Sequence, residues 1–125
     1  MIRIASFGSG RTGQVLMRIK CNEPLYVDEY LNVYLEGHDS DSVYRNGNGS
    51  INWLGDFHFI YNGDNTLAWV KEAHFIYNGN RTIAWIGNTH FIYNGSNRIE
   101  WIDDTHILYN GNGTIAWVGD KRIYW

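Results

Sequence analysis

Four histidines recur along the chain, and imidazole is the commonest side-chain metal ligand in proteins. They are spaced 16 residues apart, at His58, His74, His90 and His106. Imidazoles that share one zinc ion must bring their nitrogens within a few ångströms of each other, because Zn–N bonds are about 2.0–2.1 Å long. In antiparallel hairpins successive histidines would lie two strands apart, roughly 9.6 Å. We therefore expect no metal site. We expect instead an aromatic ladder with the tryptophans that share this period, Trp53, Trp69, Trp85, Trp101 and Trp117.

Near the N-terminus, Gly8, Gly10 and Gly13 have the spacing GxGxxG, and the preceding IRIASF could form a strand. Residues 2–29 thus resemble a dinucleotide-binding fingerprint, in which backbone amides approach a pyrophosphate at a helix N-terminus. The resemblance implies an acidic residue further on, and Asp28 or Glu29 lies near that place. However, the following QVLMRIK is as strand-like as it is helical, and no chain remains for further βαβ units. We interpret GSGRTG as a loop between strands, expect no cofactor, and keep nucleotide binding as an alternative.

A third series combines aromatic rings with amide side chains. Aromatic faces can stack on sugar rings, and an asparagine amide offers both donors and acceptors to hydroxyl groups. Equal spacing would present several weak sites at once, which raises avidity without new contacts. The predicted ligand-binding residues are Tyr61, Tyr77, Tyr93, Tyr109, Phe59, Phe75, Phe91, Asn62, Asn78, Asn94 and Asn110.

A 16-residue repeat positions all of these side chains. Four units cover 58–73, 74–89, 90–105 and 106–121, after a degenerate unit at 42–57. Each contains Asn-Gly, the strongest short hairpin signal, and a second turn-like pair such as Gly55-Asp56. We predict two five-residue strands per unit, a four-residue loop such as 62–65 whose last residue is left-handed, and a two-residue turn. The predicted fold is an all-β, curled antiparallel meander or barrel of tandem hairpins, with a β-solenoid as the alternative.

Two connections of even length would keep facing residues on one side of the sheet throughout. One face would then carry the tryptophans, histidines and isoleucines, and the other the phenylalanines, tyrosines and threonines. The Trp/His/Ile face contains no charged residue before Arg122, whereas the other face includes Arg98 and Glu100. Since burial of an unpaired charge is costly, we predict that the Trp/His/Ile face points to the core. The Phe/Tyr/Thr face would be partly wet.

Residues 1–41 do not repeat, but IRIASF, QVLMRIK and PLYVDEYLNVYLEG resemble strands. We predict a β cap over 1–41 and a hairpin-repeat array over 42–125, within one structural domain. A few short strands cannot easily cover so long an array, so we expect it to close as a barrel or to form a homo-oligomer.

Composition narrows the function classes. The net charge is −3, with 10 basic and 13 acidic residues, and no basic patch indicates nucleic-acid binding. A single cysteine, Cys21, cannot form an internal disulfide. No apolar run approaches the roughly 20 residues of a membrane span, and no signal peptide is evident, so a cytoplasmic location is the default.

No convergent set of catalytic side chains is visible, and we expect no enzymatic activity. The sequence favours a repeat binding module, lectin-like, that binds carbohydrate multivalently through a periodic aromatic face and Asn-Gly loops. The alternative is a structural or self-assembling protein that uses the aromatic face as a subunit interface.

Overall fold

The computed structural model describes residues 1–37 and 40–124. It confirms the all-β class and the hairpin repeat, because the described residues form 15 strands and no helix. Accordingly, the described part of the chain includes no helix of the length and hydropathy needed to cross a membrane. Trp125, the last residue of the predicted array, lies outside the described residues.

The non-repeating segment folds into a small antiparallel sheet. Its strands are β1 (Ile2–Ser6), β2 (Leu16–Arg18), β3 (Leu25–Asp28) and β4 (Asn32–Leu35), in the order β1-β4-β3-β2. These strands coincide with the three segments that the sequence marks as strand-like. The GSGRTG segment lies in the connection between β1 and β2, as a loop.

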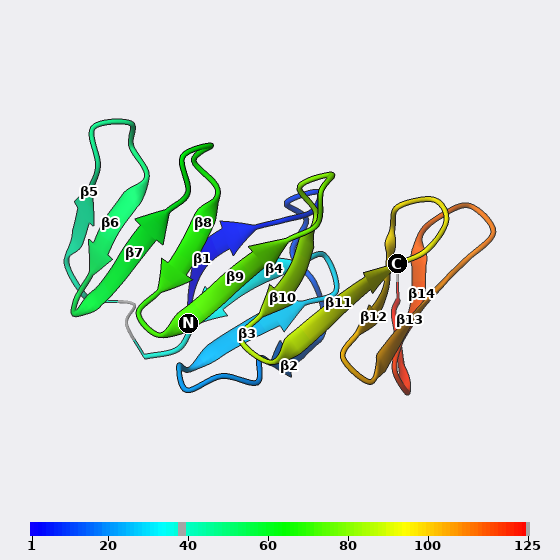
Figure 1. Ribbon diagram of the computed structural model, residues 1–125. Helices are drawn as coiled ribbons and strands as arrows, with labels where there is room; N and C mark the ends of the chain where they lie inside the picture. Colours follow the sequence, from blue (N-terminus) through cyan, green and yellow to red (C-terminus); the bar gives the residue numbers. More distant parts are fainter. Residues whose placement is uncertain (38–39, 125) are drawn as a thin grey trace.

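The repeats form one 11-stranded meander in which each strand pairs with its neighbours in sequence. Of the two predicted forms, the antiparallel meander is confirmed, while the barrel is not formed because the sheet remains open. In Figure 1 it runs from β5 at the left to β14 at the right, with the sheet β1–β4 against its middle part. Its strands are β5 (Val43–Arg45), β6 (Ile51–Leu54), β7 (Phe57–Tyr61), β8 (Leu67–Val70), β9 (Ala73–Tyr77), β10 (Ile83–Ile86), β11 (Thr89–Tyr93), β12 (Ile99–Ile102), β13 (Thr105–Tyr109), β14 (Ile115–Val118) and β15 (Lys121–Arg122).

The two-residue turns are confirmed. Val70 pairs with Ala73 across residues 71–72, and the same register recurs in the other units. The left-handed loop positions are confirmed as well, since each has a positive φ between 62° and 88°. They are Gly49, Asn65, Arg81, Asn97 and Gly113.

The longer connection differs from the prediction by one residue. The Asn62 amide donates to the Thr66 carbonyl at 2.8 Å, which closes a loop of residues 63–65 rather than one of four residues. The remaining residue is absorbed by a β-bulge, because Ile60 pairs with Trp69 and Tyr61 with Leu67, which leaves Ala68 without a partner. The same bulge recurs in every unit, at Asn52, Ala84, Glu100 and Ala116.

The bulge changes which residues share a face, and the buried face is the opposite of the one predicted. Because one residue is added, Leu67 and Val70 lie on the same face as the phenylalanines, while Trp69 lies opposite. Phe59, Phe75 and Phe91 are each 2% exposed, whereas Trp53, Trp69, Trp85 and Trp117 are 36–38% exposed. The prediction that the Trp/His/Ile face points to the core is therefore wrong, and the Phe/Tyr face is the buried one.

The small sheet packs on that buried face. The Phe7 ring lies 6.0 Å from the ring of Phe75 and 5.9 Å from that of Tyr77, between ring centroids. The Lys20 amide donates to the Thr89 hydroxyl at 2.7 Å, and the Lys20 side chain forms an ion pair with Asp103. Residues 1–37 thus supply part of the hydrophobic core of the array.

Candidate functional site

Successive Asn-Gly loops are separated by grooves that repeat along one margin of the array. The first loop groove lies between loop 62–66 and loop 78–81, with residues 74–77 of β9 beneath, and has a volume of about 590 Å³. The second loop groove lies between loop 78–82 and loop 94–97, over residues 90–93 of β11, and measures about 550 Å³. Corresponding residues of the two grooves differ by 16 in number, so the repeat builds two similar sites, in which Asp64 and Arg81 of the first correspond to Asn80 and Asn97 of the second.

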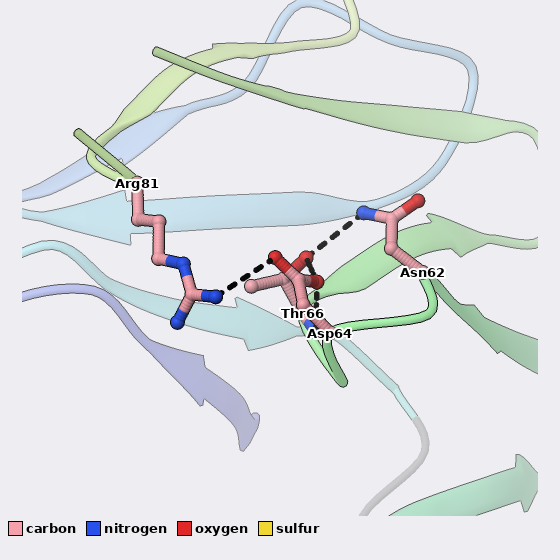
Figure 2. Close-up of polar contacts among 4 residues, drawn as sticks. All are labelled: Asn62, Asp64, Thr66 and Arg81. Carbon is pink, nitrogen blue, oxygen red and sulfur yellow. Dashed lines mark hydrogen bonds and ion pairs between the residues drawn. The ribbon is translucent and has the colours of Figure 1, made fainter. Parts of the chain in front are cut away.

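Each loop is held by its own side chains. In the first, Asp64 Oδ1 accepts hydrogen bonds from the amide and hydroxyl of Thr66, and Asn62 Nδ2 donates to Thr66 Oγ1 at 2.9 Å (Figure 2). This pattern is an Asx turn, in which a short polar side chain replaces a backbone partner. The hydrogen bonds from Thr66 and the nearby Arg81 lower the pKa of Asp64. Equivalent bonds recur in loops 78–82 and 110–114. Loop 94–98, the far wall of the second groove, is held differently, because Asn94 Oδ1 accepts from the amides of Ser96 and Arg98.

Neighbouring loops also contact each other across the grooves. The Arg81 guanidinium lies 3.7 Å from the Asp64 carboxylate, as Figure 2 shows. At the equivalent place one unit later, Asn80 Nδ2 donates to Asn97 Oδ1 at 3.2 Å. Both contacts join exposed groups, so they contribute little to stability. Their effect is to set the spacing between adjacent loops.

The structure brings seven of the eleven predicted residues together in these two grooves: Asn62, Phe75, Tyr77 and Asn78 in the first, and Asn78, Phe91, Tyr93 and Asn94 in the second. Phe59, Tyr61, Tyr109 and Asn110 line neither groove. Asn62 and Asn78 face each other across the first, with Phe75 and Tyr77 between them, and Asn78 also lines the second. The roles differ from those expected. The phenylalanines are buried, and they form the groove floor rather than an open stacking surface.

The tyrosines are half-buried, and their hydroxyls are already engaged. Tyr77 Oη donates to the Leu67 carbonyl at 2.7 Å, and the same bond joins each tyrosine to the residue ten positions earlier. Burial raises the pKa of Tyr77 and of Tyr93 to about 12, partly offset by these backbone hydrogen bonds. The tyrosine ring edges are thus available to a ligand, while the hydroxyl donors are not.

These tyrosines predict the response of the fold to alkaline pH. Their pKa in the folded chain exceeds the value near 10 of the unfolded chain, so the unfolded state loses its protons first. Stability should therefore be complete below pH 10 and fall as the pH rises toward 12. Urea unfolding at a series of pH values, followed by tryptophan fluorescence, measures this loss. Tyr93→Phe should weaken the pH dependence, because it removes one of the phenols whose pKa is raised to about 12.

Sequence reasoning did not select Asp64, Arg81, Asn80 and Asn97 as site residues, although they form the contacts across the grooves. The signal was present, because these residues lie one or two positions after each Asn-Gly pair. The loop-to-loop pairing depends on the packing of neighbouring hairpins and could not be read from one unit alone.

The outer face of the array carries the predicted aromatic neighbours. Trp53, Trp69, Trp85 and Trp101 each stack on the histidine across the two-residue turn, with ring centroids 4.1–4.2 Å apart and planes within 8°. Trp117 faces Arg122 instead, whose Cζ lies 5.8 Å from the ring centroid. The continuous ladder is not formed, since Trp69 faces Ile60 on its other side and not His58. Within residues 1–37 and 40–124, no three His, Cys, Asp or Glu side chains are grouped so that they could hold a metal ion.

The glycine-rich loop uses its amides internally. The amides of Gln14 and Val15 donate to the buried Glu29 carboxylate at 2.8–3.0 Å, and the Gly13 amide donates to Asp28 Oδ2 at 3.0 Å. The amides of Gly13, Gln14 and Val15 are therefore already bound to carboxylates and are not available to a pyrophosphate. In addition, no helix follows the loop within the described residues. The geometry therefore does not support the nucleotide alternative.

Comparison of the chain with models of protein families, with curated proteins and with solved structures found no match in any of the three.

Proposed function

We propose that this protein is a non-enzymatic, multivalent carbohydrate-binding module whose ligand occupies the repeated loop grooves. The observation that carries the proposal is the repetition itself: two neighbouring grooves of about 590 and 550 Å³ present the same kinds of side chain. One molecule can occupy both grooves in the same way only if its own structure repeats, as that of a polysaccharide does.

The chemistry of the grooves suits a neutral, hydroxyl-rich ligand. Asn78 uses one N–H of its amide for Thr82, which leaves a second donor and an acceptor for hydroxyl groups. Asn62 has the same arrangement across the first groove. The ring of Tyr77 offers an apolar edge between them, against which the C–H groups of a sugar could pack.

Spacing gives this arrangement its avidity. Equivalent positions are two strands apart, or roughly 9.6 Å. A chain that spans two grooves binds the second one intramolecularly, at an effective concentration in the millimolar range. Affinity should therefore rise steeply once an oligosaccharide is long enough to reach both.

Asn78→Ser provides the test, because Asn78 lines both grooves. Serine is accepted at this turn position but lacks the amide, so affinity should fall by about tenfold or more, and the dependence on oligosaccharide length should weaken. A glycan array with neutral plant, fungal and bacterial polysaccharides identifies the ligand, and calorimetry with an oligosaccharide series of increasing length measures the effect.

Asn46→Ser is the matched control. It makes the same change at the equivalent turn position of the first, degenerate unit, where Asn46 also donates to the residue four positions on. Binding by this variant should match the parent chain. Absence of any glycan binding at high protein concentration, or equal losses in both variants, would contradict the proposal.

Self-assembly is a second candidate, favoured by the outer face. Ile60, Ile76, Ile92 and Leu108 are 43–45% exposed on this face, beside indoles that are also partly exposed. A continuous apolar surface of this kind is typical of an interaction site. Sedimentation velocity over a range of protein concentrations distinguishes a monomer, which counts against this candidate, from a concentration-dependent oligomer, which supports it.

A further inference from the structure

A separate cavity of about 510 Å³ lies between the glycine-rich side of the small sheet and the hairpins of the array. Phe7, Tyr30 and Leu31 line it from the small sheet, and Ile99 and Ile115 line it from the array. Its volume is within the range of roughly 300–1,000 Å³ that is typical of small-molecule sites. Its walls are mainly apolar, unlike those of the loop grooves.

The repeat departs from its own pattern at this cavity. Arg98 occupies the position that is threonine in the neighbouring units, at Thr82 and Thr114. In those units the threonine hydroxyl accepts a hydrogen bond from the loop asparagine. Here Asn94 has turned, and its Oδ1 accepts from the amides of Ser96 and Arg98. The fold of the hairpin does not require arginine at this position, since its neighbours form the same hairpin without one.

The Arg98 guanidinium lies against the following loop, where it donates to the Gly113 carbonyl at 2.8 Å. Gly113 has a left-handed backbone, at the position that is Gly49, Asn65, Arg81 or Asn97 in the other units. A Cβ atom placed on Gly113 would lie 2.7 Å from Arg98 Nη1, so a side chain at this position would require the guanidinium to move.

The guanidinium is oriented by an aromatic ring as well. Arg98 Cζ lies 5.7 Å from the centroid of Tyr109, and across the cavity Arg11 Cζ lies 5.9 Å from the centroid of Tyr30. Burial raises the pKa of Tyr109, while the Arg98 charge opposes the rise and the charge of Tyr30 adds to it. The two guanidinium groups of Arg11 and Arg98 and the two phenol rings of Tyr30 and Tyr109 thus lie around one opening.

The lining carries a net positive charge. Its acidic member is Glu29, whose carboxylate is already bound by the amides of Gln14 and Val15. Arg11 and Arg98 are both exposed at the mouth, whereas Ile99 and Ile115 are 6% and 4% exposed. The cavity thus combines a cationic mouth with an apolar, aromatic interior. It complements a molecule with an apolar ring at one end, which enters the cavity, and an anionic group at the other, which stays at the mouth.

From this arrangement we infer that the cavity is a binding site for a small aromatic carboxylate, with its ring among Phe7, Leu31 and Ile115 and its carboxylate at Arg98. Arg98 retains donors beyond the one used for Gly113, because a guanidinium carries five N–H groups. A planar, bidentate contact with a carboxylate is the interaction that arginine makes best. The cavity adjoins the second loop groove, since Thr82, Tyr93 and Asn97 line both, but the inference does not rest on carbohydrate binding.

The test compares 3-phenylpropionate with its uncharged isostere 3-phenylpropionamide, each titrated into the ¹⁵N-labelled full chain by NMR. The carboxylate should shift the amide signals around the cavity, including those of Gly8 and Gly113, and should bind at least about tenfold more tightly than the amide. Arg98→Thr, which restores the residue of the neighbouring units, should bind both compounds equally and weakly. Its spectrum should otherwise remain that of the folded parent.

Three results would overturn the inference: equal affinities for the two compounds in the parent chain, shifts confined to other surfaces, or an unchanged preference for the carboxylate in Arg98→Thr. Should Arg98→Thr fold poorly, Arg98→Gln serves the same purpose, since it removes the charge and keeps a polar side chain. Arg81→Gln is the charge control on the neighbouring loop and should bind 3-phenylpropionate as the parent does.

Discussion

Phe75→Ala should lower the free energy of unfolding by about 3–5 kcal/mol, the usual cost of removing a buried aromatic ring from a core. Phe75 is 2% exposed and packs on the ring of Phe7, so its loss opens a cavity where the small sheet meets the array. This is a large part of the roughly 5–15 kcal/mol that stabilises an ordinary domain. Urea unfolding followed by circular dichroism measures the change.

Ile76→Thr is the control for this prediction, because Ile76 is the next residue along the strand and is 44% exposed on the outer face. Threonine is also β-branched, so the strand keeps its conformational preference. The change should stay within about 0.5 kcal/mol. If Ile76→Thr proved as costly as Phe75→Ala, the outer face would have to be covered in solution.

Asp28→Ala should have an effect of similar size, about 3–5 kcal/mol, through polar contacts rather than packing. The Asp28 carboxylate is 1% exposed and accepts hydrogen bonds from the amides of Gly13, Tyr30 and Asn32 and from the Tyr34 hydroxyl. Each bond to a charged group contributes roughly 1.5–3 kcal/mol, and some of the released donors can reach water. Thermal or urea unfolding would measure the loss.

Two further variants make the Asp28 prediction specific. Asp120→Ala removes an exposed carboxylate from a two-residue turn and should change stability by no more than about 0.5 kcal/mol. In Asp28→Asn the charge is lost while the shape is kept. The pKa of Tyr34, which burial and then Asp28 raise to about 12, should fall in that variant, as ultraviolet titration would show. A Tyr34 pKa that did not move would mean that burial alone sets it.

The exposed Trp/His stacks have a consequence for how ligands could use the outer face. A sugar ring stacks on the flat face of an aromatic side chain, and in each stack the histidine already covers one face of the indole. Ile60 lies beside the other face of Trp69 in the register of the sheet. The outer face therefore favours contact with another apolar surface over stacking with carbohydrate, which is why the loop grooves are the better carbohydrate site.

Local sequence determined the hairpins of this protein. Each hairpin is specified by backbone conformation alone, through the Asn-Gly pair, the left-handed residue two positions after it and the two-residue turn. The left-handed residue is confirmed at Asn65, and the two-residue turn is confirmed by the pairing of Val70 with Ala73. The Trp/His pairing followed as well, because a two-residue turn leaves only one register for the residues that flank it. Such features depend only on residues that are close in sequence, so they can be predicted from the sequence alone.

The buried face was decided only by the tertiary structure. A four-residue loop with regular strands and a three-residue loop with a bulge both fill 16 residues, yet they place Leu67 on opposite faces. Both faces are rich in apolar side chains, so hydrophobicity could not choose between them. The choice came from docking of the small sheet, through Phe7 on Phe75 and Lys20 on Thr89, between residues nearly 70 positions apart. The inter-sheet cavity arises from the same long-range packing. The contacts between loops, such as Asn80 with Asn97, depend on the packing of neighbouring hairpins and cannot be predicted from a single repeat unit.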